Sequence, residues 1–173
     1  MTGLEDLYRE IILDHYRSPR NRGELDCPPA RRVEGFNPLC GDEIVLYVEV
    51  DSEDNVANIA MSGQGCCISQ SSASMMTAAV KGRSVAEARR LTKAFKAMLS
   101  ISDTTSVSGA IVDLHGAGFE TNESRPPALG DLEALSGVAT YPVRIKCATL
   151  SWNALLQALD ADAPTGATEA ASP

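Results

Sequence analysis

The chain has 173 residues, of which 44% are hydrophobic and 22% are charged, and its formal net charge is −8. This length predicts one domain whose core is large enough to be stable without disulfides. The acidic balance argues against a nucleic-acid-binding protein, and no apolar run reaches the ~18–20 residues of a membrane span. The first residues also lack the apolar core of a signal peptide, so we expect a cytoplasmic protein that binds neither nucleic acid nor membrane.

The first predicted element is an amphipathic helix over Leu4–Tyr16. It is expected to end before Pro19, because proline disfavours helical geometry in the residue that precedes it. His15, near its end, is expected to complement the C-terminal dipole and not to bind a metal. The apolar residues of this helix recur at helical spacing and are expected to pack in the core or on a sheet: Leu4, Leu7, Ile11 and Ile12.

Three short strands are predicted next, and the second alternates cleanly between two sets of side chains. A polar loop joins the second and third strands as a hairpin. Between the first two, Asn-Pro and Gly-Asp pairs in Asn37–Asp42 predict a turn, in which Cys40 and Asp42 can both point into one cleft. The expected strands are Arg31–Phe36, Glu43–Val50 and Val56–Ser62.

A glycine-broken stretch, Gly63–Ser74, follows the third strand and leads into a helix predicted over Ile68–Val80. Its two leading glycines allow the backbone to bend tightly and to approach its neighbours closely. Cys66 is thereby placed at a helix N-terminus, where unpaired N–H groups and the helix dipole favour the thiolate. Cys67 is expected to point roughly 100° away around the helix and to pack against other side chains.

A capping box, in which Ser84 is followed by Glu87, starts the next predicted helix. Ser100–Gly130 is rich in Ser, Gly and Thr, and it predicts a long loop insertion. The solvated loop is also the expected place of His115.

The chain then returns through a short helix, predicted over Leu132–Leu135 with Asp131 as its cap. The last predicted helix is Arg144–Leu159, with Cys147 at its head. Residues 161–173 are dominated by small and turn-forming residues and predict a disordered tail, so we expect the domain to span residues 1–160.

Five cysteines are scattered along the chain, an odd number that favours metal or thiol chemistry over a disulfide framework. Our central hypothesis is that Cys40, Cys66 and Cys147 converge with Asp42 on one site. Tetrahedral Zn²⁺ accepts three thiolates and a carboxylate, at roughly 2.0–2.3 Å, and thiolates also suit iron–sulfur clusters. The carboxylate is the weakest partner for a soft metal, so we expect it to be exchangeable.

Two cations flank the third cysteine of this hypothesis. Arg144 and Lys146 are expected either to lower the pKa of Cys147 or to bind an anionic sulfur species, although two exposed residues on a helix are an equally good interpretation. Cys27, which precedes two prolines, is expected to be exposed and to have no role.

Four segments around these residues resemble the U-type iron–sulfur assembly family, which includes IscU, the N-terminal domain of NifU, and SufU. The similarity runs from about Leu4 to Leu159 and is greatest to the SufU branch. The segments are Leu-Tyr-Arg-Glu-Ile-Ile-Leu-Asp-His-Tyr-Arg-Ser-Pro-Arg-Asn, Asn-Pro-Leu-Cys-Gly-Asp, Gly-Gln-Gly-Cys-Cys-Ile-Ser and Arg-Ile-Lys-Cys-Ala-Thr-Leu-Ser-Trp.

The resemblance implies an IscU/SufE-like α+β fold, with a small antiparallel sheet of about three strands packed with helices and a site at one end. The three family cysteines fall on Cys40, Cys66 and Cys147, and the family aspartate falls on Asp42. In the SufU branch this set holds zinc, and a SufS-type cysteine desulfurase is thought to free Cys40 from the metal to accept sulfur as a persulfide.

The resemblance therefore implies a zinc-dependent sulfurtransferase, with Arg144 supporting the acceptor and with downstream iron–sulfur assembly proteins as further partners. Whether such a protein acts as an enzyme or as an accessory is left open. One alternative is a scaffold that uses the same ligands to build a 2Fe–2S cluster, or to bind iron, and hands the cluster to apo-proteins. Another is a regulator of the desulfurase in which zinc only staples the fold.

Two departures argue against the scaffold alternative. IscU-type members have a histidine directly before the third cysteine, where this chain has Lys146. They also carry a Leu-Pro-Pro-Val-Lys chaperone-docking motif, where this chain has Ala-Thr-Tyr-Pro-Val-Arg. The inserted loop at about residues 100–130 is SufU-like but longer than usual.

Overall fold

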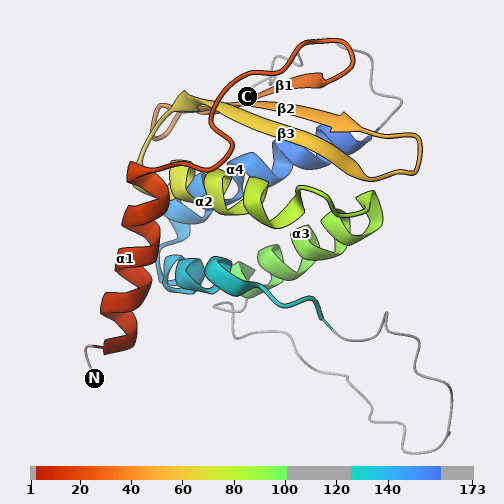
Figure 1. The fold of residues 1–173 in the computed structure, drawn as a ribbon. Coiled ribbons are helices and arrows are strands. Elements are labelled where there is room, and N and C mark those ends of the chain that lie inside the picture. The colour runs from red at the N-terminus through yellow and green to blue at the C-terminus, as the bar shows by residue number, and fades with distance from the viewer. Residues whose placement is uncertain (1–2, 101–125, 161–173) are drawn as a thin grey trace, which may run out of the picture.

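The computed structural model describes residues 3–100 and 126–160, and it shows a three-stranded antiparallel sheet covered on one face by helices (Figure 1). The strands are β1 (Arg31–Asn37), β2 (Asp42–Val50) and β3 (Val56–Gln64), in the order β1-β2-β3. Asn37 pairs with Asp42, so a tight turn joins the first two strands. The predicted α+β fold is confirmed, and each strand has the position that its sequence pattern indicated.

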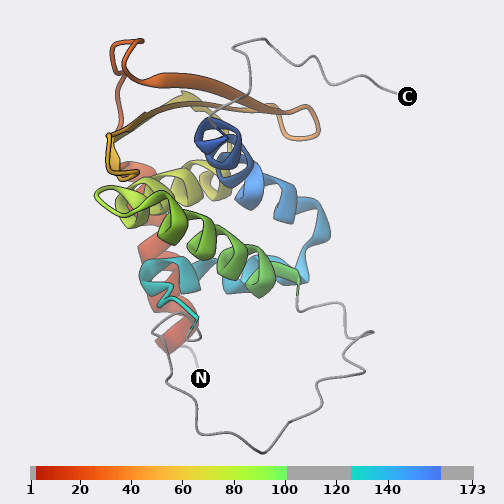
Figure 2. The same ribbon diagram turned by 90° about the vertical axis from the view of Figure 1, so that its right-hand side faces the viewer.

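Five helices complete the described part of the chain. Two of them, α2 and α4, lie directly against the sheet, while α3 and η1 contact each other and the sheet-covering helices (Figure 2). The helix α1 stands to one side and packs on α2 and η1. Their bounds are α1 Gly3–Arg17, α2 Cys67–Val80, α3 Val85–Ser100, the 3₁₀ helix η1 Gly130–Thr140 and α4 Pro142–Leu159.

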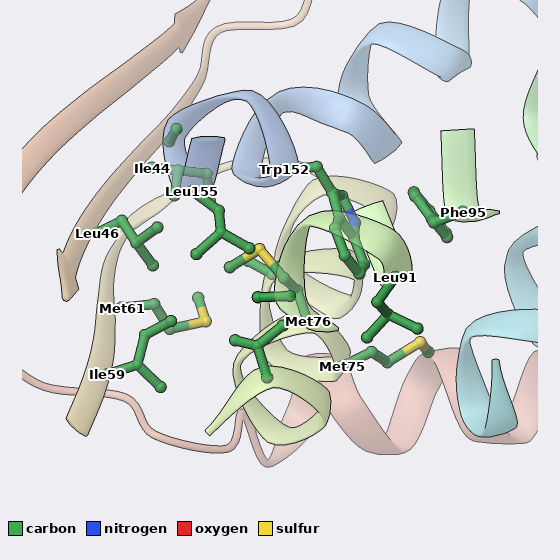
Figure 3. Close-up of a cluster of buried hydrophobic side chains, with 14 of the residues drawn as sticks. Ile44, Leu46, Ile59, Met61, Met75, Met76, Leu91, Phe95, Trp152 and Leu155 are labelled. Atoms are coloured by element: carbon green, nitrogen blue, oxygen red, sulfur yellow. The ribbon is translucent and has the colours of Figure 1, made fainter. Parts of the chain in front are cut away.

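The core lies between the sheet and the helices. Side chains of β2 alternate as predicted, with Ile44, Leu46 and Val48 in the main core. On the opposite face, Val45 and Tyr47 belong to a second, smaller cluster. Deeper among the helices, the rings of Phe95 and Trp152 stack with their centroids 4.6 Å apart, and Met75 and Met76 belong to the same cluster (Figure 3).

The prediction that the whole apolar stripe of α1 packs in the core is wrong for its first two turns. Leu4 and Leu7 are 60% and 54% exposed. Further along, Ile11 and Ile12 do pack against the core. The physical reason is that α1 packs on α2 and η1 and makes no extensive contact with the sheet, so its N-terminal half has little to pack against.

His15 is buried and ties three helices together, which is a larger role than the dipole interaction expected of it. Its Nδ1 lies 2.8 Å from Ser74 Oγ of α2, and its Nε2 lies 3.2 Å from Asp131 Oδ2 of η1. Asp131 was predicted to cap this helix, but it lies inside the first turn of η1. The residue in the cap position is Leu129, which makes no side-chain cap, and the predicted short helix is a longer 3₁₀ helix.

Other expectations are met closely. The capping box is present, because Glu87 N–H donates to Ser84 Oγ at 3.2 Å and Ser84 N–H donates to Glu87 Oε2 at the same distance. None of the described helices is long and apolar enough to cross a membrane. The predicted loop insertion with His115, apart from its last residues, and the predicted tail lie outside the described residues.

Candidate metal centre

The turn between β1 and β2 positions the first two candidate ligands. The backbone N–H groups of Cys40 and Gly41 donate to the Asn37 carbonyl at 3.3 Å and 2.9 Å. Gly41 adopts a φ of +67°, which a residue with a Cβ rarely takes, so the turn depends on glycine there. As a result Cys40 is half-buried at the rim of the turn, while Asp42 is fully buried at the start of β2.

Cys66 is brought to the same place by the bend between β3 and α2. Its N–H donates to Asp42 Oδ1 at 2.8 Å, and its Sγ lies 3.8 Å from Asp42 Oδ2. Cys66 is the N-cap of α2 and accepts a hydrogen bond from the Ser69 N–H, which confirms the predicted position at a helix start. A Cβ on Gly65 would lie 2.6 Å from Asp42 Oδ1, so the close approach expected of the glycines is also present.

Cys147 enters the site from α4. Its thiol donates to Cys40 Sγ at 3.3 Å, and it accepts a hydrogen bond of 3.5 Å from Asn37 Nδ2. The sequence predicted Cys147 at the head of this helix. Because α4 begins at Pro142, Cys147 lies in its second turn instead. Its side chain is completely buried.

The ligand atoms of Cys40, Asp42 and Cys147 lie within 4.8 Å of one another. Cys66 lies beside Asp42 but outside this mutually close group, so its place in the ligand set stays a prediction. In tetrahedral zinc sites with Zn–S bonds of about 2.3 Å, neighbouring sulfurs are roughly 3.8 Å apart. The Cys40 and Cys147 sulfurs are 3.3 Å apart, somewhat closer than in such a site, and the Cys66 sulfur is 3.8 Å from Asp42 Oδ2. Thiols and a carboxylate at these separations are a donor set that suits a soft divalent metal.

Burial is the main influence on the pKa of Cys147. Removal from water raises the pKa of this thiol, and the hydrogen bonds with Cys40 and Asp42 raise that pKa further. The expectation that Arg144 and Lys146 lower it is therefore wrong for the metal-free site, because removal from water outweighs the exposed cations.

Arg144 instead lies beside the half-buried cysteine, with its Nη1 4.0 Å from Cys40 Sγ. The neighbouring cysteine sulfurs raise the pKa of this guanidinium, with the Cys147 sulfur as the largest cause. The arginine is thus placed to stabilise an anionic sulfur at the rim of the site.

Asn37 is the site residue that sequence reasoning missed. Its amide bridges the Leu39 N–H, at 3.3 Å, and the Cys147 sulfur. The Asn-Pro pair indicated a turn, but no pattern indicated that the side chain would reach a cysteine 110 positions away. Of the two remaining cysteines, Cys27 is exposed as expected, and Cys67 is half-buried.

A family model described as the NifU-like N terminal domain matches residues 7–115. The chain belongs to this family. Members similar to it include the zinc-dependent sulfurtransferase SufU of Bacillus subtilis, which is 43% identical over 88% of each chain. The iron–sulfur cluster assembly scaffold protein IscU of Streptococcus pyogenes is 40% identical, over 92% of this chain and 86% of that protein.

Solved structures of similar proteins share this fold. The crystal structure of a proposed iron–sulfur cluster assembly scaffold protein for the SUF system, from Fervidobacterium islandicum, is 29% identical and covers 91% of this chain, with a TM-score of 0.68. The match extends over 99% of that structure. This NifU-like domain therefore carries its cysteine and aspartate cluster on the architecture shared by SufU and IscU proteins.

Proposed function

We propose that the protein is a zinc-dependent sulfurtransferase that accepts persulfide sulfur from a cysteine desulfurase for iron–sulfur cluster assembly. Cys40 is the acceptor, and Cys40, Asp42, Cys66 and Cys147 form the metal site. The overall similarity to the zinc-dependent SufU supports this function. Downstream, the sulfur would pass to other proteins of cluster assembly.

The observation that carries the proposal is the difference in burial within the cluster. Cys147 and Asp42 are fully buried, whereas Cys40 and Cys66 are half-buried, and of these two it is Cys40 that lies on a turn with Arg144 beside its sulfur. A structural zinc site is closed by four protein ligands, whereas a working site keeps one position that can open. Cys40 is therefore accessible to a partner and has a cation beside its sulfur, while Asp42 and Cys147 are held inside the fold.

Sulfur acceptance needs a thiolate that is both stabilised and releasable. The Cys40 thiolate attacks the terminal sulfur of the desulfurase persulfide, a new sulfur–sulfur bond forms at Cys40, and the desulfurase cysteine leaves as a thiolate. Arg144 then stabilises the anionic terminal sulfur of the Cys40 persulfide. A bound zinc ion would hold the site's cysteines as thiolates at neutral pH.

The function is tested by cysteine turnover of the cognate desulfurase, with the protein added first zinc-loaded and then metal-stripped. We expect strong stimulation by the zinc-loaded form alone. In the same assay Cys40→Ala should accept no sulfur, as measured by mass spectrometry of the persulfide. The matched control is Cys27→Ala, which removes the exposed cysteine that is remote from the cluster in sequence. Full sulfur acceptance by Cys40→Ala would contradict the assignment of Cys40 as the acceptor.

Cluster scaffolding is the second candidate function, because the relative from Streptococcus pyogenes is a scaffold protein and the same donor set suits a 2Fe–2S cluster. No stimulation by either form, together with a visible absorption band once iron and sulfide are supplied, would favour the scaffold. Asp42→Ala helps to separate the two, since it weakens zinc binding in a transferase but traps a cluster on a scaffold.

A further inference from the structure

A groove runs beside the cluster, between the end of β1 with its following turn and the outer face of α4. Its volume is about 360 Å³. The residues that line it come from these two segments and from no other described part of the chain: Phe36, Asn37, Pro38, Leu39, Lys146, Thr149, Leu150 and Asn153.

One wall of the groove is apolar. Phe36 and Leu39 are 64% and 66% exposed, and because both line this wall they present apolar surface to one groove. The outer face of α4 supplies Leu150 to the same surface. A ligand that covers this wall would remove a substantial apolar area from water.

The other wall is cationic and donates hydrogen bonds. Lys146 lines it, and within the described residues this lysine has no carboxylate partner. Asn153 Oδ1 accepts a hydrogen bond from the Lys96 ammonium, which leaves the Asn153 amide N–H₂ to donate. No acidic residue lines the groove, although the whole chain carries a net charge of −8.

We propose that this groove binds a short segment of the desulfurase in which an apolar side chain stands next to a carboxylate. The apolar side chain would lie on Phe36 and Leu39, and the carboxylate would pair with Lys146 and the Asn153 amide. Charge complementarity selects this occupant, because an acidic group gains both an ammonium partner and a hydrogen-bond donor there. The inference rests on the proposed function, which supplies the partner.

The groove shares its apolar wall with the acceptor turn. Asn37 lines the groove and also holds Cys147 Sγ and the Leu39 N–H, and Cys40 follows directly in the chain. A segment seated in the groove therefore fixes the turn that carries the acceptor sulfur, so that docking and orientation of Cys40 occur together.

Isothermal titration of the zinc-loaded protein with the cognate desulfurase tests the groove through binding and not through activity. Asn153→Glu places a negative charge two turns from Cys147, where it would repel the proposed carboxylate. Lys146→Glu reverses the charge of the proposed partner itself. We expect each variant to raise Kd at least tenfold, and we expect the wild-type affinity to fall more steeply with salt than that of Asn153→Glu.

Gln157→Glu is the matched control, because it adds the same charge one turn further along α4 and outside the groove. Zinc content measured on every variant shows that the cluster is intact. A Kd for Asn153→Glu within twofold of wild type overturns the groove assignment, as does an equal loss in Gln157→Glu. Failure of the wild-type protein to bind any desulfurase would instead overturn the proposed function, on which the groove depends.

Discussion

Gly65 shows how tightly a single position can control the cluster. A Cβ at this position would meet Asp42 Oδ1 at 2.6 Å and Ser69 Oγ at 2.7 Å, both closer than real Cβ contacts. The Asp42 carboxylate is held by the neighbouring Cys66 N–H and cannot move away without losing that bond. The absence of a side chain at Gly65 is therefore a requirement of the site.

We expect Gly65→Ala to lower zinc affinity by tenfold or more, since Asp42 must shift away from the thiols. Overpacking of this kind also costs typically ~1–3 kcal/mol of folding free energy. Competition with a chromogenic chelator measures the affinity, and urea unfolding measures the stability. Gly137→Ala is the control, because a Cβ there has no atom within 4 Å; equal zinc affinity in the two variants would contradict this explanation.

At the scale of single residues, the sequence identified the residues that lie close together, Cys40, Asp42 and Cys147, better than their surroundings, while the place of Cys66 in the ligand set stays a prediction. The sequence pattern alone identifies cysteines that lie next to glycine and proline. Their convergence follows once the strands and helices are placed. The amide of Asn37 and the burial that raises the pKa of Cys147 depend on how α4 lies against the turn. No local pattern reports such a contact.

Among the elements, α2 and α4 form the contact on which the geometry of the cluster depends. Ser72 Oγ donates to the Ala148 carbonyl at 2.6 Å and accepts from Trp152 Nε1 at 3.1 Å. All three groups are buried, so this hydroxyl fixes how one helix lies along the other. Cys147 immediately precedes Ala148, and its position is therefore set by the same contact.

We expect Ser72→Ala to destabilise the fold by about 1–3 kcal/mol, because it leaves the buried indole N–H of Trp152 without an acceptor. Thermal or urea unfolding provides the measurement. Ser71→Ala is a closely matched control, since Ser71 is equally buried but donates only within its own helix, to the Ile68 carbonyl. A larger loss in the Ser71 variant would show that the interhelical bonds are not what matters.

The helices also show what periodicity cannot convey. The spacing of apolar residues in α1 was right and its bounds were right to within one residue, yet Leu4 and Leu7 are exposed. Periodicity identifies a face of a helix but not the length over which a neighbour covers it. The same limit applies to η1, which is longer than the predicted short helix and contacts all four α-helices.

For the whole molecule, the main core and the cluster are largely separate. The main cluster of buried apolar side chains lies between the sheet and the helices and among the helices themselves, and it contains no cysteine. The fold therefore has its own source of stability, in contrast to small domains that unfold when their metal is removed.

We expect the chelated protein to keep its helical circular dichroism and its cooperative unfolding, with only a lower melting temperature. Zinc present at 100 times its Kd would add about 2.7 kcal/mol to the free energy of unfolding through binding alone. Circular dichroism and calorimetry, before and after chelation and again after zinc is restored, provide the measurement. Loss of the helical signal on chelation would show that the metal is structural.

The cluster joins two cysteines that are 107 residues apart, one on the first hairpin and one on the last helix. Because synthesis proceeds from the N-terminus, Cys40, Asp42 and Cys66 leave the ribosome long before Cys147 exists. A nascent chain that has reached only the end of α3 contains all three described strands but still lacks the buried thiol that completes the close group of donors. The proposed acceptor site is thus completed late in synthesis, and a chain that can hold the proposed metal is one that has already been made as far as α4.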